Sequence, residues 1–344
     1  MATNRHTRWF RRIALLAAVL AFGVVVLGAY VRLSDAGLGC PDWPTCYSHW
    51  TAGAAAQDAE AAGALYPDRP VRYAAAIREM VHRYFATGLG LLIVLLAIIA
   101  VVNRRSRSLP VALPVFLLGF VVLQGVFGAL TVTWQLQPII VTAHLLGGLT
   151  TLALLAWLVM RPEVRSPAPT ERGLMGWALV GLVTLGLQLA LGGWTSSNYA
   201  AVACPDFPTC QNQWLPAMDL RDAFVPWHQL GVDYTGGVLD HPARVAIHYV
   251  HRLGAILTAL VLTIVALLTL MRGRSTHLRL AALGVLGALA LQIGIGISMV
   301  LMTFPLSVAT LHNAGAALLV VAFVALLRYL NPLSPTYLAG ERRF

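Results

Sequence analysis

The sequence predicts an all-α membrane protein whose eight transmembrane helices form two pseudo-symmetric, parallel four-helix bundles. Composition, a series of long apolar runs and an internal repeat predict this fold. Of the 344 residues, 58% are hydrophobic and only 11% are charged, whereas about a quarter of the residues in a soluble domain are charged. Such a composition is typical of a chain that lies in a lipid bilayer.

Eight apolar runs are long enough to cross the bilayer, because a spanning helix needs about 20 mostly apolar residues. The predicted helices cover residues 13–33, 79–102, 110–132, 139–160, 174–194, 247–270, 279–302 and 306–329. The first run follows several arginines and resembles a signal peptide, but it is long and lacks a convincing small-residue cleavage site. We therefore expect it to be retained as a helix.

The charged residues predict the topology. Arginine supplies all the fixed positive side-chain charge behind the net charge of +10, and it clusters in the short loops and at both ends. Because loops rich in arginine stay in the cytoplasm, both termini are expected there, with the long loops 34–78 and 195–246 in the periplasm of a bacterial inner membrane. This distribution favours the lipid bilayer as partner and argues against nucleic acid.

An internal repeat divides the chain into two halves of four helices. The segment Cys40–Cys46 returns as Cys204–Cys210, and three further segments recur at nearly the same spacing. These are Val81–Arg83 with Val250–Arg252, Leu123–Gly125 with Leu291–Ile293, and Ala143–Leu145 with Leu311–Asn313. A repeat of four helices preserves orientation, so we expect parallel halves covering residues 1–165 and 166–344.

Four histidines lie at matching depth in this repeat: His82, His144, His251 and His312. An ionisable side chain inside a membrane indicates function, although a neutral histidine bonded to a backbone carbonyl is the structural alternative. Two imidazoles from facing helices suffice for heme iron, whereas zinc or copper usually needs further ligands. Glycine and alanine one turn after each histidine leave room for a flat macrocycle, or simply allow close helix packing.

Three charged residues accompany these histidines. Glu79 precedes His82 by three residues and shares its helical face, while the repeat places His248 at the equivalent position. A carboxylate there can accept protons or stabilise positive charge; an ion pair with Arg83 is the alternative. Arg83 and Arg252 are candidates to bind heme propionates, unless they only reach to the membrane interface.

The four cysteines lie in the two long outer loops. In an oxidising compartment we expect two disulfides within the loops, Cys40–Cys46 and Cys204–Cys210. Their spacing does not decide between a structural role and redox cycling. A zinc site of four cysteines requires the two loops to meet.

The chain resembles the heme A synthase family over nearly its whole length. The resemblance is carried by Gly37–Pro44, Glu79–Arg83, Thr142–His144, Cys204–Pro208, Gly236–Arg252 and Leu311–Asn313. It implies oxidation of the C8 methyl group of heme O to a formyl group, which gives heme A for terminal oxidases. His82 and His144 would then hold heme O, with Glu79 as the catalytic residue beside the reacting methyl group.

The resemblance also implies a cofactor and partners. His251 and His312 would ligate heme b, which relays electrons to an acceptor that the sequence does not reveal; a quinone is one candidate. Heme O synthase, the protoheme farnesyltransferase, and the assembly of a terminal oxidase are the implied partners. The main rival interpretation is a diheme b-type cytochrome that transfers electrons without modifying heme. A disulfide-generating oxidoreductase and a parallel-repeat transporter are further rivals.

Overall fold

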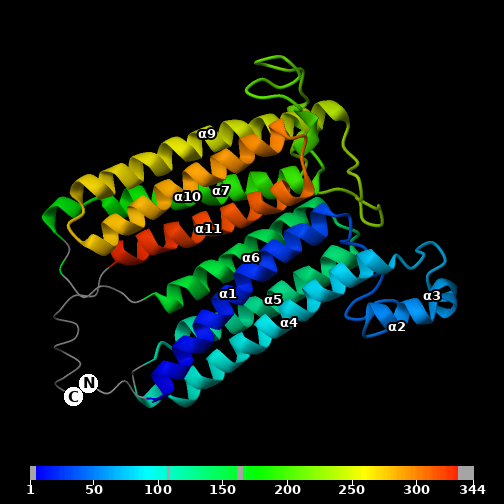
Figure 1. The fold of residues 1–344 in the computed structure, drawn as a ribbon, viewed down its shortest axis with the longest axis horizontal. Coiled ribbons are helices and arrows are strands. Elements are labelled where there is room, and N and C mark those ends of the chain that lie inside the picture. The colour runs from blue at the N-terminus through cyan, green and yellow to red at the C-terminus, as the bar shows by residue number, and fades with distance from the viewer. Residues whose placement is uncertain (1–4, 107–108, 161–165, 167, 332–344) are drawn as a thin grey trace.

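The computed structural model describes residues 5–106, 109–160, 166 and 168–331. Eight of its helices are long and apolar enough to cross a membrane (Figure 1). They are α1 (Arg5–Leu33), α4 (Tyr73–Val102), α5 (Ala112–Thr133), α6 (Pro138–Val159), α7 (Leu174–Ser197), α9 (His241–Arg272), α10 (Thr276–Leu301) and α11 (Leu306–Leu330). These residues form no β-strand. The prediction of an all-helical chain with eight spanning helices is confirmed, as expected where lipid offers no hydrogen bonds to the backbone.

The spanning helices lie in two groups of four. Figure 1 shows α1, α4, α5 and α6 together, and α7, α9, α10 and α11 together; we call them the N-terminal set and the C-terminal set. Buried apolar residues fill each set, including Leu96 and Leu152 in the first and Leu262 and Phe323 in the second. The sets meet where α1 contacts α11 and where α6 contacts both α7 and α11.

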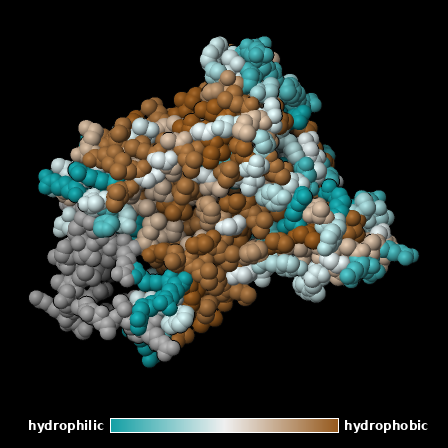
Figure 2. All heavy atoms as spheres, in the orientation of Figure 1, coloured by the Kyte–Doolittle hydropathy of each residue, from teal (hydrophilic) through white to brown (hydrophobic). Residues whose placement is uncertain are grey.

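The apolar residues on the outside of the helices form a belt. Figure 2 shows hydrophobic residues across the middle of the molecule and hydrophilic residues gathered at its ends. Leu91, Val122, Leu187 and Leu260 lie in this belt, and each is more than half exposed. So large an apolar surface exceeds what a soluble protein leaves in water. The chain is therefore a multi-pass membrane protein.

Several helices begin earlier than the apolar runs predict, and two of them, α4 and α9, carry candidate site residues. Helix α4 starts at Tyr73 and α9 at His241, each six residues before the predicted start. Hydropathy detects only the part of a helix that lies in lipid, whereas the backbone continues as helix into the polar region. Glu79 and His248 consequently lie about two turns inside their helices. They do not lie in the first turn.

The two long outer loops are correspondingly shorter than predicted. They contain short helices: α2 (Ala52–Gln57) and α3 (Ala59–Leu65) in the first loop, and α8 (Leu220–Ala223) in the second. The expected boundary at residues 165 and 166 falls where only residue 166 is described. Both chain ends, residues 1–4 and 332–344, also lie outside the described part.

Close helix packing in the C-terminal set depends on Gly181. A Cβ atom at this position of α7 would lie 2.8 Å from Cζ of Phe323 on α11 and 3.2 Å from a methyl carbon of Leu262 on α9. All three residues are buried. An added methyl group must therefore separate these helices or displace the phenylalanine.

We expect Gly181→Ala to lower the melting temperature of the purified protein in detergent, because overpacking a core costs about 1–3 kcal/mol. Gly186→Ala is the matched control, since Gly186 lies on the same helix with no atom within 4 Å of its added Cβ. Equal melting temperatures for the two variants would contradict this account of the packing.

Candidate functional site

Each of the four intramembrane histidines lies against a glycine of a neighbouring helix. His82 on α4 faces Gly28 on α1, and a Cβ atom on Gly28 would lie 2.9 Å from Cε1 of the imidazole. The same approach recurs between α6 and α5, between α9 and α7, and between α11 and α10. A Cβ atom would lie 3.5 Å from Cε1 of His144 if added to Gly128 and 3.3 Å from Cε1 of His251 if added to Gly192. At Gly296 it would lie 3.0 Å from Cε1 of His312. Glycine at these positions gives the imidazoles room between the helices.

The histidines form two pairs, one in each set of helices. His82 and His144 lie near enough to interact electrostatically, and so do His251 and His312. The Nδ1 atoms of His82 and His144 are buried without a hydrogen-bond partner among the described residues. A buried imidazole without a partner is costly. Each pair offers two imidazole nitrogens from facing helices, a donor set that suits heme iron.

Glutamine side chains pack against three glycines that lie one turn after these histidines. Gly147, Gly254 and Gly315 each follow a histidine by one turn, where room for a macrocycle or close helix packing was expected. A Cβ atom there would overlap Nε2 of Gln124 at Gly147, Oε1 of Gln188 at Gly254 and Oε1 of Gln292 at Gly315. These glycines therefore receive glutamine side chains.

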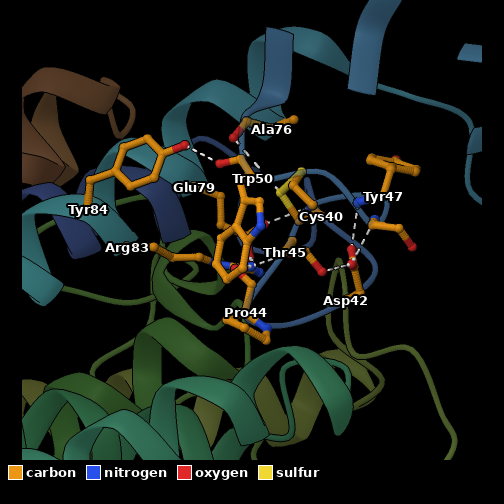
Figure 3. The surroundings of a disulfide bond; sticks show 12 residues. Cys40, Asp42, Pro44, Thr45, Tyr47, Trp50, Ala76, Glu79, Arg83 and Tyr84 are labelled. Carbon is orange, nitrogen blue, oxygen red and sulfur yellow. Dashed lines mark hydrogen bonds and ion pairs between the residues drawn. A yellow bond between two sulfur atoms is a disulfide. The ribbon is translucent and has the colours of Figure 1, made fainter. Parts of the chain in front are cut away.

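The carboxylate of Glu79 is buried and has two charged or polar partners. Its Oε2 accepts a hydrogen bond of 2.9 Å from the Cys40 N–H, and its Oε1 forms an ion pair of 2.5 Å with Nη2 of Arg83 (Figure 3). Only 4% of the residue is exposed. The ion pair that sequence offered as an alternative role thus exists. It does not exclude chemistry, because it holds the carboxylate in a fixed position one helical turn from His82.

Arg83 also fastens the first outer loop to α4. Its Nη1 donates to the carbonyls of Thr45 at 2.7 Å and Pro44 at 3.3 Å. Figure 3 shows the side chain extending toward the loop that carries the disulfide. Contact between Arg83 and a propionate stays a prediction, and in this structure its hydrogen bonds go to the loop and to Glu79.

The C-terminal set repeats this link with one exchange. Arg252 donates to the carbonyls of Thr209 at 2.7 Å and Cys204 at 2.9 Å, and its Nε lies 3.3 Å from Nε2 of His248. His248 is buried and occupies the place that Glu79 has in the other set. A neutral or cationic ring therefore replaces an acid beside the second histidine pair.

All four cysteines form disulfides. Cys40 bonds to Cys46 and Cys204 to Cys210, with Cα–Cα distances of 4.7 Å in both. No thiol is left to bind zinc. Among the described residues, no three histidine, cysteine or acidic side chains gather as a metal site. The four-cysteine zinc site considered from the sequence does not form.

Sequence reasoning missed two aspartates that shape the disulfide loops. Asp42 accepts hydrogen bonds from the side chain of Thr45 and from the N–H groups of Tyr47 and Ser48 (Figure 3). Asp206 does the same in the second loop. Burial opposes ionisation of Asp206, but hydrogen bonds from Thr209 and two backbone N–H groups outweigh it and lower the pKa. The repeated Asp-x-x-Thr spacing was the available signal.

It also missed the glutamine contacts. Gln188 and Gln292 reach the rings of His251 and His312. The pair Gln124 and Gln292 was visible in the repeat, but Gln188 has no glutamine counterpart. Only the folded chain brings Gln188 to a histidine.

Comparison with known proteins identifies relatives of this chain. The family described as cytochrome oxidase assembly protein matches residues 11–324. A heme A synthase of Shewanella oneidensis is 41% identical over 92% of this chain and 94% of its own length. Heme A synthases of Rhizorhabdus wittichii and Halalkalibacterium halodurans are each 26% identical, covering 90% and 88% of this chain and 90% and 91% of their own lengths. With relatives that match along almost the whole chain, this protein belongs to the heme A synthase family.

Proposed function

We propose that this chain oxidises the C8 methyl group of heme O to a formyl group and so produces heme A for terminal oxidases. Family membership supports the substrate and product. The single observation that carries the assignment of the reacting half is the buried Glu79 beside His82, at a position where the C-terminal set has His248. At the equivalent position beside the other histidine pair the chain has a histidine in place of the acid.

The N-terminal set is the proposed substrate site. His82 and His144 hold the iron of heme O, and Glu79 lies one helical turn from His82. The conversion of methyl to formyl takes one oxygen atom from water and releases four protons and four electrons. Glu79 accepts protons and stabilises positive charge that develops at the methyl carbon. The Cys40 N–H and Arg83 keep the carboxylate in place during successive steps.

The C-terminal set is the proposed site of resident heme b, held by His251 and His312. Heme b supplies one-electron redox chemistry when it is bound. Arg83 and Arg252 remain candidates for propionate contacts, with hydrogen bonds to the loops as their other role. The electron acceptor is proposed to be a small membrane-soluble oxidant such as a quinone. Heme O synthase and terminal oxidase assembly are the proposed partners.

The proposed architecture is two pseudo-symmetric parallel bundles, divided near residues 165 and 166. Reciprocal contacts support a two-fold relation: α1 contacts α11, while their repeat counterparts α7 and α6 contact each other. The recurring glycine–histidine pairs give further support. With arginine-rich loops inside, both termini lie in the cytoplasm of a bacterial inner membrane and the disulfide loops lie in the periplasm.

Analysis of the bound pigments tests this function. Protein produced together with a heme O synthase should yield heme b plus heme O or heme A when its hemes are extracted and separated by chromatography. The rival diheme cytochrome predicts heme b alone and no heme A. That result would refute the proposed reaction.

Glu79→Gln should retain bound heme but lower the yield of heme A by about 100-fold or more, because removing a general base typically costs a factor of 10²–10⁴. The yield is measured by chromatography of extracted heme. Glu60→Gln is the control, since Glu60 is an exposed glutamate of α3 in the first outer loop. Normal heme A production by the Glu79 variant would remove this carboxylate from the mechanism.

The two histidine pairs should differ in the pigment that they hold. We expect His251→Ala to lose heme b, and His82→Ala to keep heme b while losing heme O and heme A, because each variant removes one iron ligand. Heme per chain is measured by extraction and absorbance. His241→Ala, an exposed histidine at the start of α9, should keep the full complement. If both ligand variants lose the same pigment, the division between the sets is wrong.

A further inference from the structure

The two histidine pairs differ in their hydrogen bonds to neighbouring side chains. In the C-terminal set, Nε2 of Gln188 lies 3.1 Å from Nδ1 of His251 and donates to the carbonyl of the same residue at 3.1 Å. Nε2 of Gln292 lies 3.4 Å from Nδ1 and 3.3 Å from Nε2 of His312. In the N-terminal set, Nδ1 of both His82 and His144 is buried without a partner among the described residues. A glutamine therefore holds each ring of one pair and neither ring of the other.

For His251 and His82, the asymmetry follows from a sequence difference at one position of the repeat. Gln188 lies four residues before Gly192, the glycine against His251. Val24 lies four residues before Gly28, the glycine against His82. Residues four apart share one face of a helix, so Val24 and Gln188 occupy equivalent places beside their histidines. Valine cannot hydrogen-bond to an imidazole.

The remaining glutamine pair shows that side-chain type alone does not decide the contact. Gln124 and Gln292 are equivalent in the repeat, and each lies over a glycine of the next helix, Gly147 or Gly315. Nevertheless, Nδ1 of His144 has no partner, whereas the ring of His312 has one. Both histidines of the C-terminal pair thus have a hydrogen-bond partner at the ring, whereas Nδ1 of neither histidine of the N-terminal pair has one among the described residues.

A second ring nitrogen that is hydrogen-bonded fixes the orientation of a metal-binding histidine and strengthens it as a ligand. A side-chain amide carries both a donor and an acceptor. In this structure Nε2 of each amide faces the ring, and Oε1 of Gln188 and of Gln292 is buried without a partner. Turning the amide over presents this acceptor to an Nδ1–H group once Nε2 of the imidazole binds iron. A resident cofactor needs such retention, whereas a substrate site must release its product.

We infer that Gln188, together with Gln292, makes the C-terminal pair the site that retains heme, and that the lack of these bonds makes the N-terminal pair the site that exchanges heme. This inference rests on the proposed function and deepens it. Gln188 acts through His251 and is therefore a positioning residue. Val24 is its counterpart at the exchanging site.

Heme retention and redox potential test this role. Gln188→Val, made without a heme O supply so that heme b is the only pigment, should transfer heme to excess apomyoglobin about 10-fold faster than the unaltered protein, as expected when the partner of a metal-binding histidine is lost. Its heme b midpoint potential should rise, because a weaker ligand stabilises ferric iron less. Gln188→Glu keeps the shape and strengthens the acceptor, so the midpoint potential should fall.

The reciprocal variant tests the other half. Val24→Gln, made with a heme O supply, should slow the release of heme from the N-terminal site about 10-fold. Thr184→Val is the control, since Thr184 lies one turn before Gln188 and its hydroxyl bonds only to the carbonyl of Val180 among the described residues. Its heme release and midpoint potential should not change.

Unchanged heme transfer in Gln188→Val, or midpoint shifts of the same sign in the valine and glutamate variants, would overturn the inference. If the valine variant does not fold, the midpoint potential of Gln188→Glu decides, and an unchanged value overturns it. None of these measurements uses heme A formation. If the protein makes no heme A but the Gln188 variants change heme transfer and midpoint potential as expected, only the proposed reaction is refuted. If it makes heme A and the Gln188 variants leave both quantities unchanged, only this inference is refuted.

Discussion

The close approach of a glycine-bearing helix to a histidine-bearing helix determines the arrangement at the level of the four imidazoles. A polar ring in the membrane must be enclosed by protein, because lipid offers it no hydrogen bond. Gly28, Gly128, Gly192 and Gly296 remove the side chain that would otherwise fill the space of the ring. Each imidazole therefore lies inside its own set of helices, and the four rings come together as two pairs.

The outer loops extend this arrangement beyond the membrane. Arg83 and Arg252, each directly after a histidine, donate to carbonyls of the loop above. A disulfide and an aspartate stabilise each loop from within. Helix and loop are thus joined one residue from each of these two histidines. In the N-terminal set this link includes Glu79, so the same contacts that fold the loop also orient the proposed catalytic carboxylate.

Two exchanges on this repeated frame distinguish the halves. In the repeat, the position of Glu79 is taken by His248 in the second half, and the position of Val24 is taken by Gln188. The first places an acid beside one histidine pair, and the second gives a hydrogen-bond partner to the other pair. Neither exchange alters the helices that carry it. A few polar side chains therefore suffice to give one half of a repeated bundle a site that oxidises heme and the other half a site that retains it, as the proposed function requires.

The sequence alone determined the class of fold, because apolar runs of spanning length have no other stable arrangement in lipid than helices. It also located the histidines, the cysteine pairs and the acid, since the repeat marks equivalent positions. It misplaced the starts of α4 and α9, because hydropathy reports lipid contact and not backbone conformation.

The tertiary structure decided which groups touch. The hydrogen bonds from Cys40 to Glu79 and from Gln188 to His251 each join residues that lie on different segments of the chain. Only the packing of helices at glycines and the path of the loops fix such contacts, and local sequence patterns do not encode those distances.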